Sequence, residues 1–137
     1  MTQGSLLNSS YLSLVCGGHD LSKKTIVCNP IPFFHIYGFS TGILLPLISE
    51  TTNVFPFYFP ETTTTIGAIE KYKCNFLRAT PTQFIDLLNH PNFGKHDMSS
   101  LRNGIIAGST VPPDLLVLMK TVLNLEDIYV GYGKLNR

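Results

Sequence analysis

Residues 25–38 of this chain read TIVCNPIPFFHIYG. The segment begins with a short apolar, β-branched run, continues through two prolines, and ends at a histidine that is followed by a glycine three residues later. A continuous apolar run of this length is typical of a parallel strand that is covered on both faces. We therefore expect a strand over residues 25–29, with the lone imidazole of His35 near its carboxyl end, where open α/β sheets hold their ligands.

Strand-like and helix-like segments alternate along the rest of the chain. This alternation predicts an α/β fold, a mostly parallel sheet with covering helices. The first expected helix, over residues 5–15, carries Leu7, Tyr11, Leu14 and Val15 on one face and would end at Gly17-Gly18. The further expected helices cover residues 38–48, 62–72, 80–88 and 112–122, and the further expected strands cover residues 53–57, 75–79, 103–107 and 127–132.

Four turns follow the expected strands, at residues 30–37, 79–82, 108–111 and 131–133. Right-handed crossovers would place all four on one edge of the sheet, which predicts a ligand pocket there. In the second turn Thr80 and Gln83 have the spacing of a capping box, with a proline at the first helical position.

Composition excludes several classes of function. Charged residues make up 14% of the 137 residues, against about 25% in typical soluble domains, so we expect part of the surface to be covered by further protein. The net charge is +1 without a basic stripe, which argues against nucleic-acid binding. The longest apolar run, residues 43–48, is too short to cross a membrane. Three widely spaced cysteines give no metal-binding pattern and favour a reducing, intracellular compartment.

His35 has two interpretations on sequence alone. It could be a core histidine packed by Phe33, Phe34 and Tyr37, or a polar group in a largely apolar pocket, placed to contact a carboxylate. Two other turns are equally open. Gly108-Ser109-Thr110 could simply start a helix, or its N–H groups could approach a ligand closely. Gly131-Tyr132-Gly133 by itself is only weak evidence for a ligand-binding turn.

The four turns together resemble those of the adenylate-forming enzymes, and specifically acyl-CoA synthetases of the medium-chain, mitochondrial type. Residues 32–38 match the family pattern Pro-x-x-His-x-x-Gly, and residues 107–115, AGSTVPPDL, resemble the family's AGSPVPPEL. Residues 80–84 resemble Thr-Pro-Thr-Met-Phe, and Tyr132-Gly133 resembles the start of the family's Tyr-Gly-Thr-Thr-Glu. The resemblance runs from about Ser5 to Gly133.

The resemblance implies an enzyme that uses ATP and Mg²⁺ to convert a fatty acid to an acyl-adenylate, and then transfers the acyl group to coenzyme A, in mitochondria. It implies that His35 is catalytic, at the acyl carboxylate, and that Tyr132 stacks on adenine. The implied substrate-binding residues are Phe34, His35, Thr80 and Gly108. The implied nucleotide-binding residues are Gly108, Ser109, Thr110, Gly131, Tyr132 and Gly133.

The sequence departs from the family after Gly133, where KLNR replaces Thr-Thr-Glu. The family's phosphate loop has no counterpart in these residues either, and no metal ligand is identified. We therefore expect residues 1–137 to be an incomplete AMP-binding domain, a middle segment of the large N-terminal domain, inactive without its remainder. Two alternatives stay open: a non-catalytic remnant or pseudoenzyme that acts as a binding module, and an unrelated doubly wound binding domain.

Overall fold

A computed structural model describes residues 2–16, 24–57 and 61–133. Its helices and strands alternate as the sequence predicts. In chain order they are α1 (Gln3–Cys16), β1 (Ile26–Cys28), α2 (Ile36–Phe39), the π-helix η1 (Ser40–Leu44), α3 (Leu45–Ser49), β2 (Thr52–Val54), α4 (Thr62–Tyr72), β3 (Phe76–Ala79), α5 (Pro81–Leu88), the 3₁₀ helix η2 (Phe93–Lys95), β4 (Asn103–Ala107), α6 (Pro113–Val122) and β5 (Asp127–Gly131).

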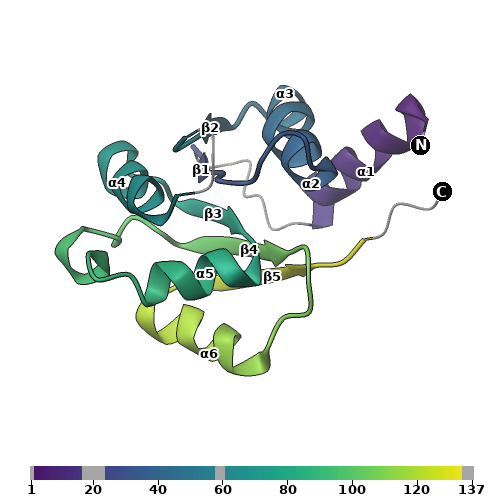
Figure 1. The fold of residues 1–137 in the computed structure, drawn as a ribbon. Helices are drawn as coiled ribbons and strands as arrows, with labels where there is room; N and C mark the ends of the chain where they lie inside the picture. The colour runs from purple at the N-terminus through teal and green to yellow at the C-terminus, as the bar shows by residue number, and fades with distance from the viewer. Residues whose placement is uncertain (1, 17–23, 58–60, 134–137) are drawn as a thin grey trace.

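The five strands form one parallel sheet in the order β2-β1-β3-β4-β5. The predicted α/β fold is therefore confirmed, and the parallel direction brings the carboxyl ends of all five strands to one edge. In Figure 1, α5 and α6 lie side by side against one face of the sheet, whereas α1, α2 and α3 gather on the opposite side, near that edge.

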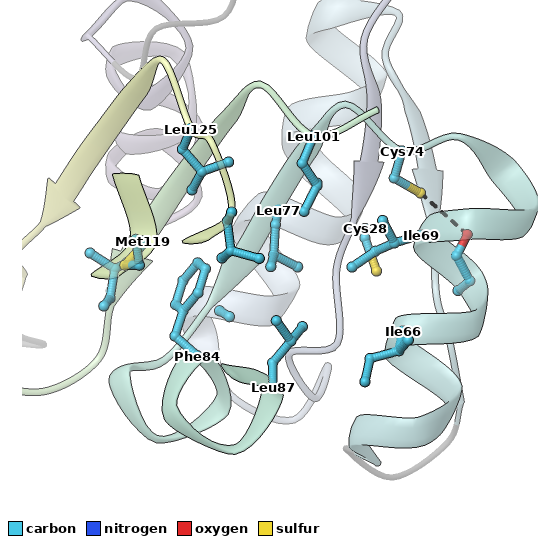
Figure 2. Close-up of a cluster of buried hydrophobic side chains, with 14 of the residues drawn as sticks. Cys28, Ile66, Ile69, Cys74, Leu77, Phe84, Leu87, Leu101, Met119 and Leu125 are labelled. Atoms are coloured by element: carbon cyan, nitrogen blue, oxygen red, sulfur yellow. Dashed lines mark hydrogen bonds between the residues drawn. The ribbon is translucent and has the colours of Figure 1, made fainter. Parts of the chain in front are cut away.

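The main core lies between the sheet and the helices α4, α5 and α6. Ile66 and Ile69 of α4, Phe84 of α5 and Met119 of α6 are fully buried against Leu77 of β3 (Figure 2). Two of the three cysteines, Cys28 and Cys74, are buried here as well, and the Cys74 thiol donates to the Ala68 carbonyl oxygen at 3.7 Å. This face supplies the hydrophobic burial that drives folding.

The opposite face of the sheet is narrower and partly polar. Val27, Phe76, Ile105 and Ala107 form a small cluster there, with Tyr37 and Tyr129 packed against it. Side chains alternate between the two faces of a strand, so Arg78 shares this face with Phe76. The register sets Ile105 opposite both Arg78 and Tyr129, so these three side chains form one row across the sheet.

Residues 36–49 form one run of helix with a π-helical middle, whereas the sequence predicts a plain helix that begins at Gly38. It begins earlier because His35 caps it: its Nδ1 accepts a hydrogen bond from the Tyr37 backbone N–H at 3.1 Å. The run is also less buried than expected, since Leu47 is 78% exposed. Gly38 is at the tightest point. A Cβ on it would lie 2.2 Å from the Pro32 carbonyl oxygen, so only glycine fits without a shift of the backbone.

The helix predicted over residues 5–15 is confirmed as α1, but most of its predicted apolar face is exposed. Leu14 is buried, whereas Leu7, Tyr11 and Val15 are more than half exposed. The contacts of α1 are with η1 and α3 rather than with the sheet, and its buried side is Ser10 and Leu14. Ser10 is tolerated there because its hydroxyl donates to the Leu6 carbonyl oxygen at 3.0 Å. The predicted stop at Gly17-Gly18 lies outside the described residues.

The other predicted elements are present with small shifts at their ends. The strand predicted over residues 53–57 is shorter, because β2 covers only Thr52–Val54. Apolar positions on the outer sides of two helices are exposed, namely Tyr72 of α4 and Leu118 and Val122 of α6. Within the ranges that the structure describes, no helix combines the length and apolar character needed to cross a bilayer.

A surface network ties the end of α4 to the loop before β4. The Glu70 carboxylate contacts His96 Nδ1 at 2.7 Å and accepts from the Asp97 backbone N–H at 3.0 Å. Lys73 Nζ lies 2.7 Å from the Asp97 carboxylate. The Asp97 N–H, and then His96, hold the pKa of Glu70 below its usual value, and Lys73, followed by Ser99, holds the pKa of Asp97 far below its usual range.

This network should make the fold acid-sensitive. A carboxyl group whose pKa is lower in the folded state stabilises that state above its unfolded pKa, and the effect is lost as the pH falls through the folded pKa. We expect the midpoint of thermal unfolding to drop between about pH 5 and pH 3, and to drop less in Asp97→Asn and Glu70→Gln. Circular dichroism melts across this range check it. Equal acid sensitivity in wild type and both variants would show that the network contributes nothing.

Candidate functional site

A pocket of about 420 Å³ opens at the carboxyl edge of the sheet, on the face that carries the small cluster. This volume is in the range of small-molecule sites. Three groups of residues line it. Strands β3, β4 and β5 and the turns after β4 and β5 contribute Arg78, Ile105, Ala107, Gly108, Tyr129, Val130, Gly131, Tyr132 and Gly133; the helical run contributes His35, Ile36, Tyr37, Ser40, Thr41 and Leu45; α1 contributes Leu6, Ser9, Ser13 and Cys16.

His35 lines this pocket as an exposed side chain, so the interpretation as a core histidine is wrong for the described structure. The reason is the turn before it: Phe34 is 89% exposed and Phe33 packs on Phe55, so neither encloses the imidazole. The hydrogen bond from the Tyr37 N–H occupies the lone pair of Nδ1. The neutral ring therefore carries its hydrogen on Nε2, which is a hydrogen-bond donor.

The lining of the pocket is mainly apolar, in agreement with the sequence, but Arg78 is buried beneath its wall and Tyr37 lies beside it. Arg78 donates to the Thr41 carbonyl oxygen, and its guanidinium carbon lies 5.6 Å from the centre of the Phe76 ring. Burial lowers the pKa of Arg78 to about 10, so the group is still charged at neutral pH. Burial raises the pKa of Tyr37 well above its usual value, so its phenol is neutral and lies 3.5 Å from the Ile105 carbonyl oxygen.

The turn after β4 reaches the pocket through Gly108. Its φ of +99° is in the region that disfavours residues with a Cβ, so the backbone conformation of this turn favours glycine. Ser109 and Thr110 follow it as exposed residues and do not line the pocket. The turn after β5 supplies Gly131, Tyr132 and Gly133, and Tyr132 is 97% exposed at its end.

Thr80 does not line the pocket; it caps the start of α5. Its hydroxyl accepts from the Gln83 N–H at 3.3 Å, and the Gln83 side chain accepts from the Thr80 N–H at 2.9 Å, which confirms the predicted capping box. Gln83 Nε2 also donates to the Pro30 carbonyl oxygen at 3.3 Å, tying α5 to the turn that leads to His35. The methyl group of Thr80 lies 3.4 Å from where a Cβ on Gly108 would be.

Replacing Thr80 with alanine should therefore lower the free energy of unfolding by about 1 kcal/mol, because the N–H of Gln83 loses its partner. Thr80→Ser keeps the hydroxyl and is the matched control, expected within about 0.5 kcal/mol of wild type. Urea unfolding followed by circular dichroism measures both. An alanine variant as stable as the serine variant would contradict the capping role.

Of the predicted site residues, the pocket brings together His35, Gly108, Gly131, Tyr132 and Gly133. It does not include Phe34, Thr80, Ser109 or Thr110 in its wall. The sequence interpretation missed Arg78, Tyr37 as a pocket residue, and Tyr129. Arg78 had a usable signal, since an arginine in the middle of a strand that is otherwise apolar is rarely buried without a specific contact.

No group of metal-ligating side chains is found in the described parts of the chain. The residues of this pocket therefore do not fit a Mg²⁺ site, and no step is derived through the metal.

A parallel sheet with helices on both faces, and with glycine-containing turns and a histidine around a pocket at its carboxyl edge, defines a doubly wound α/β domain. The family model described as "AMP-binding enzyme" matches residues 1–134, and the chain therefore belongs to this family. One similar relative is the mitochondrial medium-chain acyl-CoA ligase ACSF2 of Danio rerio, 33% identical over 133 residues. The match covers 97% of this chain and 22% of the relative, so the chain spans about a fifth of its length.

Solved structures agree on the fold. The luciferase-like enzyme of the mealworm Zophobas morio superposes with a TM-score of 0.75 at 27% identity, over 94% of this chain and 29% of that one. The N-terminal domain of FACL13 from Mycobacterium tuberculosis gives 0.76 at 19% identity, over 94% and 31%. An o-succinylbenzoate-CoA synthetase from Bacillus subtilis, in complex with ATP and magnesium ion, gives 0.69 at 22% identity, over 87% and 24%. The segment thus has the fold of adenylate-forming N-terminal domains.

Proposed function

We propose that this chain supplies part of the active site of an acyl-CoA synthetase, which activates a carboxylic acid with ATP and passes the acyl group to coenzyme A. The observation that carries the proposal is the shared pocket of His35, Gly108 and Tyr132, three residues from turns far apart in the sequence. The relative from Danio rerio is named a medium-chain acyl-CoA ligase, which favours a fatty acid as the acid and mitochondria as the location.

His35 is the residue proposed to contact the reacting carboxylate. Its Nδ1 is engaged by the Tyr37 N–H, so Nε2–H is the ring donor available to an oxygen of the acid. When a carboxylate oxygen attacks the α-phosphorus of ATP, the bond to the leaving pyrophosphate breaks as the acyl–phosphate anhydride bond forms, and the negative charge of the carboxylate is lost to the phosphate groups. A donor held in place for that change stabilises the transition state without reorganising. The same contact also orients the acid toward the nucleotide.

The charge around the pocket suits an anionic ligand. The positively charged Arg78 is buried beneath the pocket wall, and no aspartate or glutamate is present among the described residues that line the pocket. The exposed ring of Tyr132 at the mouth gives adenine a surface to stack on. Gly108 and Gly131 leave the backbone accessible beside it. ATP, which the o-succinylbenzoate-CoA synthetase structure contains together with magnesium ion, is proposed as the nucleotide substrate; the described residues of this pocket offer no Mg²⁺ ligands, so other residues would have to hold the metal.

ATP–pyrophosphate exchange over a panel of fatty acids tests the proposal. In its longest expressed form, the protein should exchange labelled pyrophosphate only when an acid is present. A polypeptide of residues 1–137 alone should give no exchange above a blank without protein, because it spans 22% of the relative's length.

Acid-dependent exchange by residues 1–137, abolished in His35→Ala, would contradict the expectation that this polypeptide alone is inactive. A longest form that binds acyl-adenylate but gives no exchange with any acid would instead favour the binding-module alternative.

A further inference from the structure

Arg78 is the pocket's most unusual residue. It lies in the central part of the sheet, on β3, and its side chain is 0% exposed. A ligand in the pocket therefore does not reach it directly, although the guanidinium lies beneath the pocket wall. Burial of a charged group is costly unless specific contacts compensate for it. One such contact is the hydrogen bond from Arg78 to Thr41, in the helical run that starts after His35. This contact indicates that Arg78 acts on the helical run.

Arg78 and Asn53 hold the π-helical part of that run from two different strands. Arg78 NH1 donates to the Thr41 carbonyl oxygen. Asn53 Nδ2, from β2, donates to the Thr41 and Gly42 carbonyl oxygens at 3.3 and 3.0 Å. A π-helix widens the backbone and is often found at functional sites. Here the carbonyl oxygens of Thr41 and Gly42 accept hydrogen bonds from Arg78 and Asn53, and these bonds hold the widened turn against the sheet.

Three successive hydrogen bonds then lead from Arg78 to the imidazole. Arg78 donates to the carbonyl oxygen of Thr41. The hydroxyl of Thr41 donates to the Tyr37 carbonyl oxygen at 2.6 Å. The backbone N–H of Tyr37 donates to Nδ1 of His35 at 3.1 Å. The last bond decides which ring nitrogen carries the hydrogen, so the state of His35 depends on the position of the first turn of the run.

We propose that Arg78 is a positioning residue for His35: it fixes the π-helical turn at Thr41, and thereby the Tyr37 N–H that keeps the imidazole in its Nε2–H form beside the pocket. The inference rests on the proposed role of His35 in the reaction. An arginine serves here because its planar guanidinium stays charged when it is buried and can bond the carbonyl oxygen while stacking near Phe76.

The test reads the imidazole directly. Protein labelled with ¹⁵N in histidine is examined at a pH where the rings are neutral, and the two ring nitrogens of His35 are assigned. In wild type we expect Nδ1 as the acceptor and Nε2 bearing the hydrogen. In Arg78→Met the two ring-nitrogen shifts should move toward those of a histidine in water, because the Tyr37 N–H is no longer held. Arg78→Lys keeps one donor for Thr41 and should restore most of the wild-type spectrum.

Kinetics of the longest expressed form give the second readout. Arg78→Met should lower kcat for acid-dependent pyrophosphate exchange about tenfold to a hundredfold and change KM for the acid less than about threefold, because misplacement affects the transition state most. Arg102→Met is the matched control. Arg102 lies before β4, outside the pocket, and bonds the Ser99 carbonyl oxygen at 2.5 Å, so its loss should leave kcat and the His35 spectrum unchanged.

Each outcome decides the question. A folded Arg78→Met variant with the wild-type His35 spectrum overturns the inference. If that variant does not fold, Thr41→Val removes the hydroxyl bond to Tyr37 and leaves the carbonyl contact with Arg78; an unchanged His35 spectrum in Thr41→Val overturns it as well. If the spectrum changes in these variants but His35→Ala retains full activity, the positioning role stands and the proposed function of His35 fails.

Discussion

Replacing His35 with alanine should slow acyl-adenylate formation about 10²–10³-fold in the longest expressed form of the protein. One donor placed at a changing oxygen charge is worth about 2–4 kcal/mol, and each 1.4 kcal/mol changes a rate tenfold. Thioester formation from preformed acyl-adenylate should be affected much less, because the free carboxylate takes no part in that step. The two half-reactions are measured separately, by pyrophosphate exchange and by acyl-CoA release.

Two variants separate this role from a structural one. His35→Asn retains a side chain that can cap the helical run, so it should keep the stability of wild type and still lose adenylate formation. His90→Ala removes a histidine outside the pocket and should leave both half-reactions intact. Equal losses in both half-reactions of His35→Ala, in proportion to the fraction unfolded, would reject the catalytic role.

Gly38→Ala should lower the free energy of unfolding by up to about 3 kcal/mol. The new Cβ would lie 2.2 Å from the Pro32 carbonyl oxygen and 2.9 Å from that of Ile31, and both are backbone atoms that cannot rotate away. Relief of this clash would displace the helical run that His35 begins, so adenylate formation should fall as well. Urea unfolding gives the stability and pyrophosphate exchange the activity.

Gly67→Ala is the matched control, because Gly67 lies within α4 and a Cβ there would meet nothing within 4 Å. Alanine is the better helix former, so this variant should gain about 0.5–1 kcal/mol. A Gly38→Ala variant as stable as wild type would contradict the close approach of Gly38 to the Pro32 carbonyl oxygen.

The architecture was predictable because local signals determine it. Apolar runs such as residues 103–107 are typical of strands covered on both faces, and the capping box at Thr80 gave the start of α5 correctly. Right-handed crossovers in a parallel sheet then indicated that the four turns would meet at one edge. Five of the predicted site residues lie in one pocket as a result.

Other features depend on tertiary contacts that no local pattern encodes. The π-helix at Ser40–Leu44 is held by side chains of β2 and β3, so the sequence around it predicts only an ordinary helix. Arg78 was missed because its place beneath the pocket depends on which face of β3 its side chain occupies. The exposure of Leu7 and Tyr11 could not be predicted, because the sequence shows that they are apolar but not that α1 packs mainly on α3 and η1.

The most direct test of the account is to map the binding of a non-hydrolysable acyl-adenylate analogue onto ¹⁵N-labelled protein by chemical-shift changes. We expect saturable changes at the amides of Tyr37, Gly108 and Gly131, reduced in His35→Ala, with the amides of α4 and α6 unaffected. Saturable changes confined to α4 and α6, or an absence of binding by a protein whose spectrum shows it to be folded, would contradict the claim that this pocket holds the acyl-adenylate.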